Sequence, residues 1–157
     1  MVRVKLAGAF LMAIGVLAAT GSLGLGKGPD EKPIFLFPVI EQDFRGQFVT
    51  DVRVNGRRVE MLIDTGASVV ALTYKDARKL RVLPDDDAFV IPVSTANGTT
   101  YAAPIMLEEV SVKSADARNV RALILPRGAS DKSLLGMTYL SQLKSFQVRD
   151  GKLVLRD

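Results

Sequence analysis

Apolar and polar side chains alternate along three stretches of the chain, which is the pattern of β-strands with one buried face. The stretches are residues 44–64 (FRGQFVTDVRVNGRRVEMLID), 88–107 (AFVIPVSTANGTTYAAPIML) and 145–156 (SFQVRDGKLVLR). Each contains a dipeptide that favours a tight turn, namely Asn55-Gly56, Asn97-Gly98 and Asp150-Gly151. The pattern therefore predicts three β-hairpins with these dipeptides at their tips.

Other segments add one strand and two short helices. Residues 120–125 (VRALIL) are an apolar run typical of a buried strand. Residues 74–80 (YKDARKL) are expected to be helical, with Thr73 as the N-cap. A second helix is expected at about residues 137–142, after the sequence SLLG. We therefore expect a mainly β fold with one or two short helices.

The N-terminal segment has a different pattern. Arg3 and Lys5 precede an uncharged run, residues 6–26, which predicts a hydrophobic helix that is either a signal peptide or a membrane anchor. The strongly apolar core, residues 6–19, is short and is followed by small residues, as in a signal peptide, whereas the whole run is long enough to cross a bilayer. A buried helix of the folded domain is the third possibility.

These segments predict a domain organisation and a location. We expect residues 1–26 to be a signal anchor or signal peptide, residues 27–33 a linker and residues 34–157 one folded domain. The positive charges before the apolar run place the domain on the extracytoplasmic, periplasmic side of the membrane. The domain is then either membrane-anchored through residues 6–26 or exported as a soluble protein.

Composition narrows the possible chemistry. The chain of 157 residues contains no His and no Cys, which excludes Ser-His and Cys-His catalysis and the usual zinc sites. The 21 basic and 17 acidic residues are scattered without a basic, aromatic-rich patch, which disfavours nucleic-acid binding. An enzyme of this composition must use Asp, Glu, Lys or Tyr as its acid and base.

One carboxylate stands out, because Asp64 directly follows the apolar run VEMLI. A buried carboxylate costs several kcal/mol unless it is paired or hydrogen-bonded. The motif Asp64-Thr65-Gly66 is consistent with an ordinary turn, and on its own it is a weak signal. Its context is more specific, since Ala67, Ser68 and a second apolar strand follow it.

Three elements together, LIDTGAS (62–68), VSTANGTTYAA (93–103) and LLGMTYL (134–140), resemble a retropepsin-like aspartic protease of the bacterial single-domain type with an N-terminal hydrophobic segment. The resemblance implies a closed acid-protease barrel with a flap hairpin. It also implies that Asp64 activates water beside a second carboxylate, acting on a protein or peptide substrate without a metal or cofactor. Because the chain has one Asp-Thr-Gly motif, the second carboxylate is expected to be Asp64 of another copy in a homodimer.

The resemblance also assigns roles to individual positions. Thr65 is expected to bond the opposite subunit, and Gly66 to let the backbone approach the two carboxylates. Leu134, Leu135 and Gly136 are expected to pack beneath the catalytic loop. The positions expected to bind substrate are Ala67 and Ser68 in the cleft, and Ala96, Asn97 and Gly98 in the flap.

Two departures and several alternatives remain. Retroviral relatives have an Asp and an Arg that pair where this chain has Ser68 and Met137, so we expect a weak dimer. The acidic run 85–87 is either an exposed turn or a cation site. The rival function is a non-catalytic peptide-binding or scaffold module at the membrane, although a module of that kind need not keep Asp64. A further possibility is an enzyme that is active only when it is concentrated in a membrane.

Overall fold

The computed structural model describes residues 37–95 and 98–157, which lie within one compact unit, Lys32–Asp157. The expected hydrophobic helix at 1–26, the linker at 27–33 and the first residues of the expected domain lie outside the described residues. Within the described part of the chain, no helix has the length and apolar character needed to span a membrane.

The first predicted hairpin joins β2 (Val49–Val54) to β3 (Arg57–Ile63), with Val54 opposite Arg57. Asn55 and Gly56 have φ values of 47° and 79°, as a type I′ turn requires at both central positions. The alternation seen in the sequence places every second side chain of this hairpin in the core. The buried side chains are those of Val52, Val54, Val59, Met61 and Ile63.

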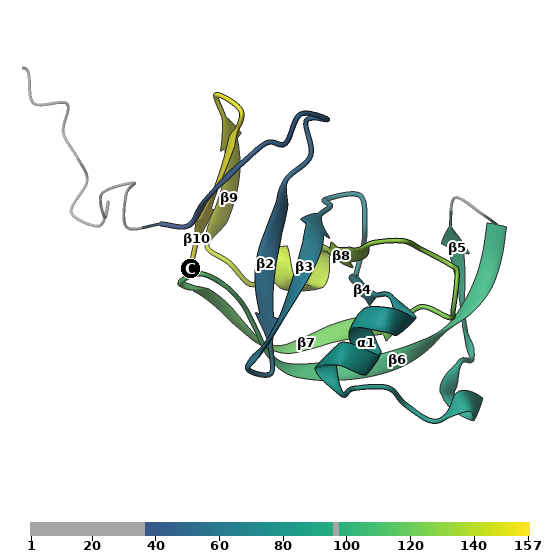
Figure 1. Cartoon of the computed structure of the whole chain (residues 1–157). Coiled ribbons are helices and arrows are strands. Elements are labelled where there is room, and N and C mark those ends of the chain that lie inside the picture. Colours follow the sequence, from purple (N-terminus) through teal and green to yellow (C-terminus); the bar gives the residue numbers. More distant parts are fainter. Residues whose placement is uncertain (1–36, 96–97) are drawn as a thin grey trace, which may run out of the picture. The chain divides into compact units, whose positions relative to one another are not determined.

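The main sheet closes into a barrel. Its order is β2-β3-β8-β4-β7-β6-β5, and an additional pairing of β2 with β6 joins the two ends of a six-stranded ring (Figure 1). The remaining members are β4 (Val70–Leu72), β5 (Ile91–Thr95), β6 (Gly98–Val112), β7 (Ala115–Ile124) and β8 (Ser133–Leu135). The closed barrel that the resemblance implied is therefore present, and β5 extends it at one edge.

The hairpin of β5 and β6 is present, but its tip is displaced from the predicted position. Thr95 is paired with Gly98, so the two connecting residues are 96 and 97, which lie outside the described residues. Gly98 is the first residue of β6 and has a φ of 106°. This positive φ, which glycine adopts readily, therefore occurs where the strand leaves the turn.

One hairpin was missed by the sequence analysis. β6 and β7 form the longest pair of strands, with Val112 opposite Ala115 and Lys113 at a φ of 55° between them. The predicted strand at 120–125 is only the second half of β7, which ends at Ile124. The connecting residues Lys113 and Ser114 give no strong turn signal, because Lys rarely adopts positive φ.

The helices lie where the sequence predicted them. Helix α1 spans Tyr74–Leu80, and the Thr73 side chain accepts a hydrogen bond from the amide of Asp76. Helix α2 spans Met137–Leu140 and is shorter than predicted, because the Gln142 amide donates to the Tyr139 carbonyl, three residues back, and the α-helical hydrogen-bond pattern stops there. A single 3₁₀ turn, η2 (Asp86–Ala88), follows α1.

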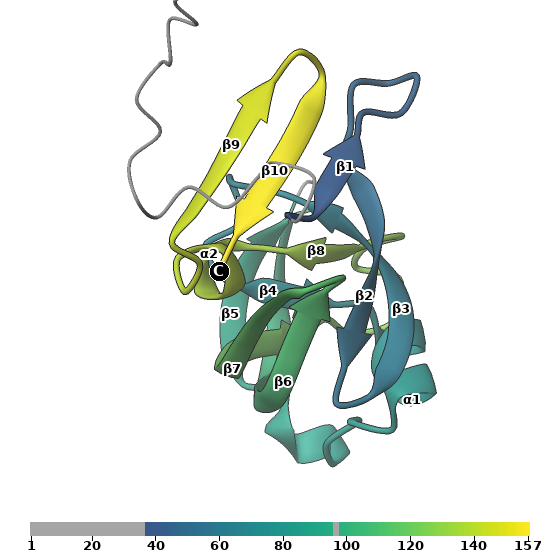
Figure 2. The ribbon, with the colours of Figure 1, turned by 90° about the vertical axis from the view of Figure 1, so that its left-hand side faces the viewer.

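The C-terminal hairpin belongs to a separate sheet. β9 (Ser145–Arg149) and β10 (Lys152–Arg156) flank a turn in which Asp150 and Gly151 have φ values of 51° and 68°, as predicted. β1 (Val39–Glu41) pairs with β10 of the same chain, which gives the order β1-β10-β9 (Figure 2). Leu153 and Leu155 on β10 join the core of the barrel.

Candidate active site

Asp64 lies immediately beyond the carboxyl end of β3. β3 pairs in parallel with β8, so that Ile63 lies opposite Leu135, and the Asp64 amide donates to the Leu135 carbonyl over 3.2 Å. The apolar run that precedes Asp64 buries its alternate side chains, whereas Asp64 itself is only half-buried. Asp64 is therefore less buried in the single chain than the apolar run before it suggested, because the strand ends at Ile63 and leaves Asp64 in the lining of a cavity.

The loop after Asp64 holds the carboxylate in one orientation. Asp64 Oδ1 accepts a hydrogen bond of 2.8 Å from the amide of Gly66, and the Asp64 carbonyl accepts one of 3.2 Å from the amide of Ala67. A Cβ atom at Gly66 would lie 3.1 Å from Asp64 Oδ1. The carboxylate is thus positioned by a backbone donor that lies close to it because residue 66 has no side chain.

Gly136 supports the same loop from below. A Cβ atom at Gly136 would lie 2.2 Å from the Val69 carbonyl oxygen and 2.6 Å from that of Ala67. The Met137 amide also donates to the Ala67 carbonyl over 2.8 Å. The predicted packing of this glycine beneath the loop is therefore confirmed, with the backbones in direct contact.

Side-chain hydrogen bonds fix the strands on either side of the loop. Thr138 Oγ1 accepts from the Val70 amide over 2.9 Å and donates to the Arg121 carbonyl over 2.7 Å. The buried Ser133 hydroxyl accepts from the Thr73 amide over 3.0 Å and donates to Asp76 Oδ2 over 2.6 Å. Both ends of β4 are consequently anchored to side chains that come from distant parts of the chain.

An open cavity of about 960 Å³ lies over the loop. The sequence-predicted residues Asp64, Gly66, Ala67 and Ser68 all line it, together with Pro92, Val93 and Ser94 of β5. Thr65 is exposed and does not line the cavity, Gly98 is exposed at the start of β6, and Ala96 and Asn97 lie outside the described residues. The remaining wall is mostly apolar and is formed by Leu62, Val69, Ala71, Leu123, Leu125, Ala129 and Leu134.

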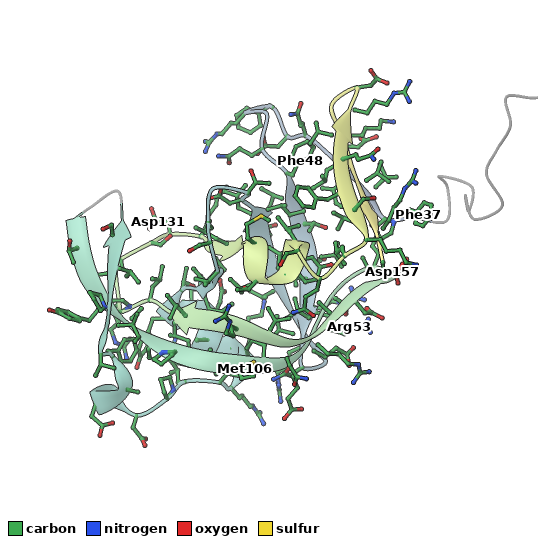
Figure 3. All side chains as sticks on the ribbon, turned by 180° about the vertical axis from the view of Figure 1, so that it is seen from behind. Phe37, Phe48, Arg53, Met106, Asp131 and Asp157 are labelled. Atoms are coloured by element: carbon green, nitrogen blue, oxygen red, sulfur yellow. The ribbon has the colours of Figure 1, made fainter. Side chains whose placement is uncertain are left out.

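Two loops that the sequence analysis did not assign to the site complete the cavity. Arg45 and Gln47 come from the loop between β1 and β2, and Asp131 and Lys132 come from the loop before β8. Lys132 Nζ lies 3.4 Å from Gln47 Oε1, which links the two loops. Asp131 lies on the same side of the molecule as the β5–β6 hairpin (Figure 3). Charges of both signs therefore border a cavity that is lined by both polar and apolar side chains.

Ser68 and Met137, which stand where retroviral relatives have a paired Asp and Arg, lie close together. Both residues line a second recess, of about 300 Å³. Arg121 of β7 lines the same recess, and none of the ion pairs among residues 37–95 and 98–157 involves these positions. The loop is therefore held at this point by the backbone contact between Met137 and Ala67.

The described residues contain no group of three or more Asp, Glu, His or Cys side chains that could hold a metal ion. The acidic run 85–87 forms the N-cap and first residues of η2, and its side chains are not buried.

Two curated proteins are similar to this chain. An "Uncharacterized protein in cobV 5'region" from Sinorhizobium sp is 44% identical over 119 residues, which cover 76% of this chain and 51% of that protein. An "Uncharacterized protein RP867" from Rickettsia prowazekii (strain Madrid E) is 34% identical over 117 residues, covering 74% of this chain and 50% of that protein. The chain spans about half the length of these relatives.

Solved structures share the fold. The crystal structure of a retropepsin-like aspartic protease from Rickettsia conorii matches with a TM-score of 0.61 at 33% identity, covering 76% of this chain and 88% of that one. The EIAV protease complexed with the inhibitor HBY-793 matches with a TM-score of 0.56 at 18% identity, covering 70% of this chain and 100% of that one, which shows a common fold alone.

A family comparison covers most of the barrel. The family described as "gag-polyprotein putative aspartyl protease" matches residues 50–142, from β2 to the end of α2. The matched range contains Asp64, the loop that positions it and Gly136 beneath. Together with the Rickettsia conorii structure, this match shows that the chain belongs to the retropepsin-like aspartic protease family.

Proposed function

We propose that the protein is an aspartic endopeptidase, in which a water molecule is activated between the Asp64 carboxylates of two identical chains. The observation that carries the proposal is the position of Asp64. Its carboxylate is held by the Gly66 amide in the lining of an open cavity of about 960 Å³. A cavity of this size accommodates several residues of an extended peptide.

The second chain is required by the chemistry. Two carboxylates in contact cannot both ionise, so they share one proton and differ in their roles. One carboxylate takes a proton from water as the oxygen attacks the peptide carbonyl carbon, and the other donates its proton to the carbonyl oxygen. Collapse of the tetrahedral intermediate breaks the C–N bond, and the nitrogen leaves with a proton from the dyad. Each chain supplies one Asp-Thr-Gly motif, so two copies complete the dyad.

The remaining predicted residues take supporting roles in this proposal. Thr65 is exposed next to Asp64, where its hydroxyl is available to the second chain. Ala67 and Ser68 border the cavity and are proposed to bind the substrate main chain. The β5–β6 hairpin, with Ala96, Asn97 and Gly98 at its end, is proposed to close over the peptide and exclude water.

The location proposed for the enzyme follows from the N-terminal charges. Arg3 and Lys5 precede the apolar run 6–26, which supports a domain held on the periplasmic side of a membrane, or exported across it. Anchoring would raise the effective concentration of a weakly associating chain. Protease treatment of cells whose outer membrane has been opened tests this topology: digestion of a membrane-bound domain supports the anchor, a soluble protein released from the periplasm supports export, and protection until the inner membrane is lysed would contradict both versions.

Cleavage of an unbiased peptide library by the full chain tests the proposed activity. Asp64→Asn is the control, because it keeps the side-chain volume and removes the catalytic carboxylate. We expect defined cleavage products with the wild type and none with the variant. Equal cleavage by both proteins would refute the role of Asp64. Peptide binding without cleavage by the wild type would support the alternative of a non-catalytic peptide-binding module.

A further inference from the structure

Two loops bring basic side chains together at the border of the cavity that contains Asp64. Arg45 belongs to the loop between β1 and β2, Lys132 belongs to the loop before β8, and both line the cavity. Lys132 Nζ donates to Gln47 Oε1 over 3.4 Å, so the two loops meet at this point. We call Arg45, Gln47 and Lys132 the basic corner of the cavity.

Local hydrogen bonds hold both loops of the basic corner. The Ser130 hydroxyl donates to the Lys132 carbonyl over 2.8 Å and accepts from the Lys132 amide over 3.3 Å. On the other loop, Asp43 Oδ1 accepts from the amides of Arg45 and Gln47 over 2.9 and 2.8 Å. The side chains of the basic corner are therefore presented by backbones with defined turns.

The basic corner carries a net positive charge. Asp43 lies near both cations, since its pKa is lowered first by the Gln47 amide and further by the charges of Lys132 and Arg45. One carboxylate therefore faces two cations. In the described part of the chain, none of the ion pairs involves Lys132, Arg45 or Asp131. Asp131 borders the cavity on the side of the β5–β6 hairpin (Figure 3).

We infer that the basic corner selects protein substrates that carry an acidic side chain, Asp or Glu, at a position enclosed by the cavity. The inference rests on the proposed function, because it names the class of peptide that passes Asp64. A substrate carboxylate accepts from the Lys132 ammonium, which has three donor hydrogens and gives one to Gln47. The Arg45 guanidinium offers further donors and keeps its charge at any physiological pH.

The rest of the wall determines which residues accompany the acidic one. Leu62, Val69, Leu123 and Leu125 line the same cavity and favour apolar side chains at other enclosed positions. In the proposed pair of chains, the basic corner occurs twice, related by the two-fold axis. We therefore expect the favoured substrates to carry an acidic residue on each side of the scissile bond, among apolar residues.

A purely structural role for Lys132 leads to a different expectation. If Lys132 only links the two loops through Gln47, its substitution weakens the binding of every peptide by the same factor. Selection by charge instead changes the ratio of affinities between peptides that contain Glu and peptides that contain Gln at one position. Glu and Gln have nearly the same shape, so this ratio isolates the effect of charge.

Peptide binding to the full chain with Asp64→Asn, in mild detergent, tests the inference without cleavage. Fluorescence anisotropy is measured for pairs of apolar peptides that differ by Glu or Gln at one position. We expect the Glu peptide to bind about fivefold more tightly at one position on each side of the centre, and less so at high salt. Adding Lys132→Glu is expected to reverse this preference. Lys75→Glu, the matched control, changes the charge equally at an exposed site on α1 outside the cavity and is expected to leave it unchanged.

A second variant and a second readout guard against a loss of folding or of affinity. Lys132→Met keeps the length of the side chain and is expected to abolish the preference. The same peptide pairs are also compared by kcat/KM with Asp64 in place. An unchanged Glu-to-Gln ratio in the Lys132 variants, or an equal loss for both peptides, would overturn the inference and leave the proposed function intact. Neither binding nor cleavage of any peptide would overturn both.

Discussion

The backbone of Gly136 lies against the carbonyl oxygen of Val69, so closely that a Cβ atom at residue 136 would stand 2.2 Å from that oxygen. Val69 belongs to the loop that begins at Asp64, and Gly136 follows directly after β8. The position of the Asp64 carboxylate relative to the barrel therefore depends on a contact between two backbones, which no side chain can replace.

Gly136→Ala is expected to displace this loop. Because the new methyl group meets backbone atoms that cannot rotate away, the free energy of unfolding is expected to fall by about 3 kcal/mol. Urea unfolding monitored by circular dichroism measures the change. Cleavage activity is expected to fall with it, even under conditions in which the variant is folded. A Gly136→Ala variant with wild-type stability would contradict this expectation, because it would show that the loop can move to accommodate the methyl group.

Gly66→Ala separates positioning from stability. Its Cβ atom would meet Asp64 Oδ1 at 3.1 Å, so the carboxylate must shift by a few tenths of an ångström. We expect a loss of roughly tenfold in kcat, because catalysis is sensitive to small displacements, with little change in the unfolding midpoint. An unchanged kcat would indicate that the carboxylate orientation set by residue 66 is unimportant.

Asp43 makes the loop that carries Arg45 and Gln47 sensitive to acid. The Gln47 amide, at 2.8 Å from Asp43 Oδ1, is the main cause of a lowered pKa of Asp43, and the Arg45 amide and the charges of Lys132 and Arg45 add to it. A folded-state pKa below the usual 3.8 stabilises the folded state above that value, and this contribution is lost as the pH falls through the lowered pKa.

Asp43→Asn is therefore expected to lower the free energy of unfolding at neutral pH. The difference from the wild type is expected to shrink as the pH falls from about 5 to about 3. Urea unfolding of both proteins across this range measures it. A difference that stayed constant with pH would show that the charge of Asp43 is not responsible.

The local elements were predictable because short-range chemistry determines them. Thr73 caps α1, and Asn55-Gly56 and Asp150-Gly151 form the turns whose positive φ values these residues tolerate. The β6–β7 hairpin was missed because Lys113 adopts positive φ in a turn without a glycine signal at that position. The displaced tip of the β5–β6 hairpin has the same origin, since Gly98 uses its positive φ inside the strand.

The site was predictable only in part. Asp64 and Gly66 belong to one three-residue motif, which contributes to a resemblance that the family comparison confirms. Arg45 and Lys132 reach the same cavity from loops far apart in the chain. Their proximity depends on the parallel pairing of β3 with β8, which local patterns do not reveal. Nor does the sequence show that Asp64 is half-exposed, because its burial depends on where the apolar strand ends.

The central claim, that one catalytic site needs Asp64 from two chains, is tested most directly by mixing wild-type protein with Asp64→Asn. The total concentration is held constant at a level at which the chains associate and exchange freely, and peptide cleavage is measured as the wild-type fraction varies. If both carboxylates are required, activity follows the square of that fraction, so an equal mixture retains about a quarter of the wild-type rate. An equal mixture that retained about half of the rate, with activity proportional to the wild-type fraction, would show that a single Asp64 suffices and would contradict the account.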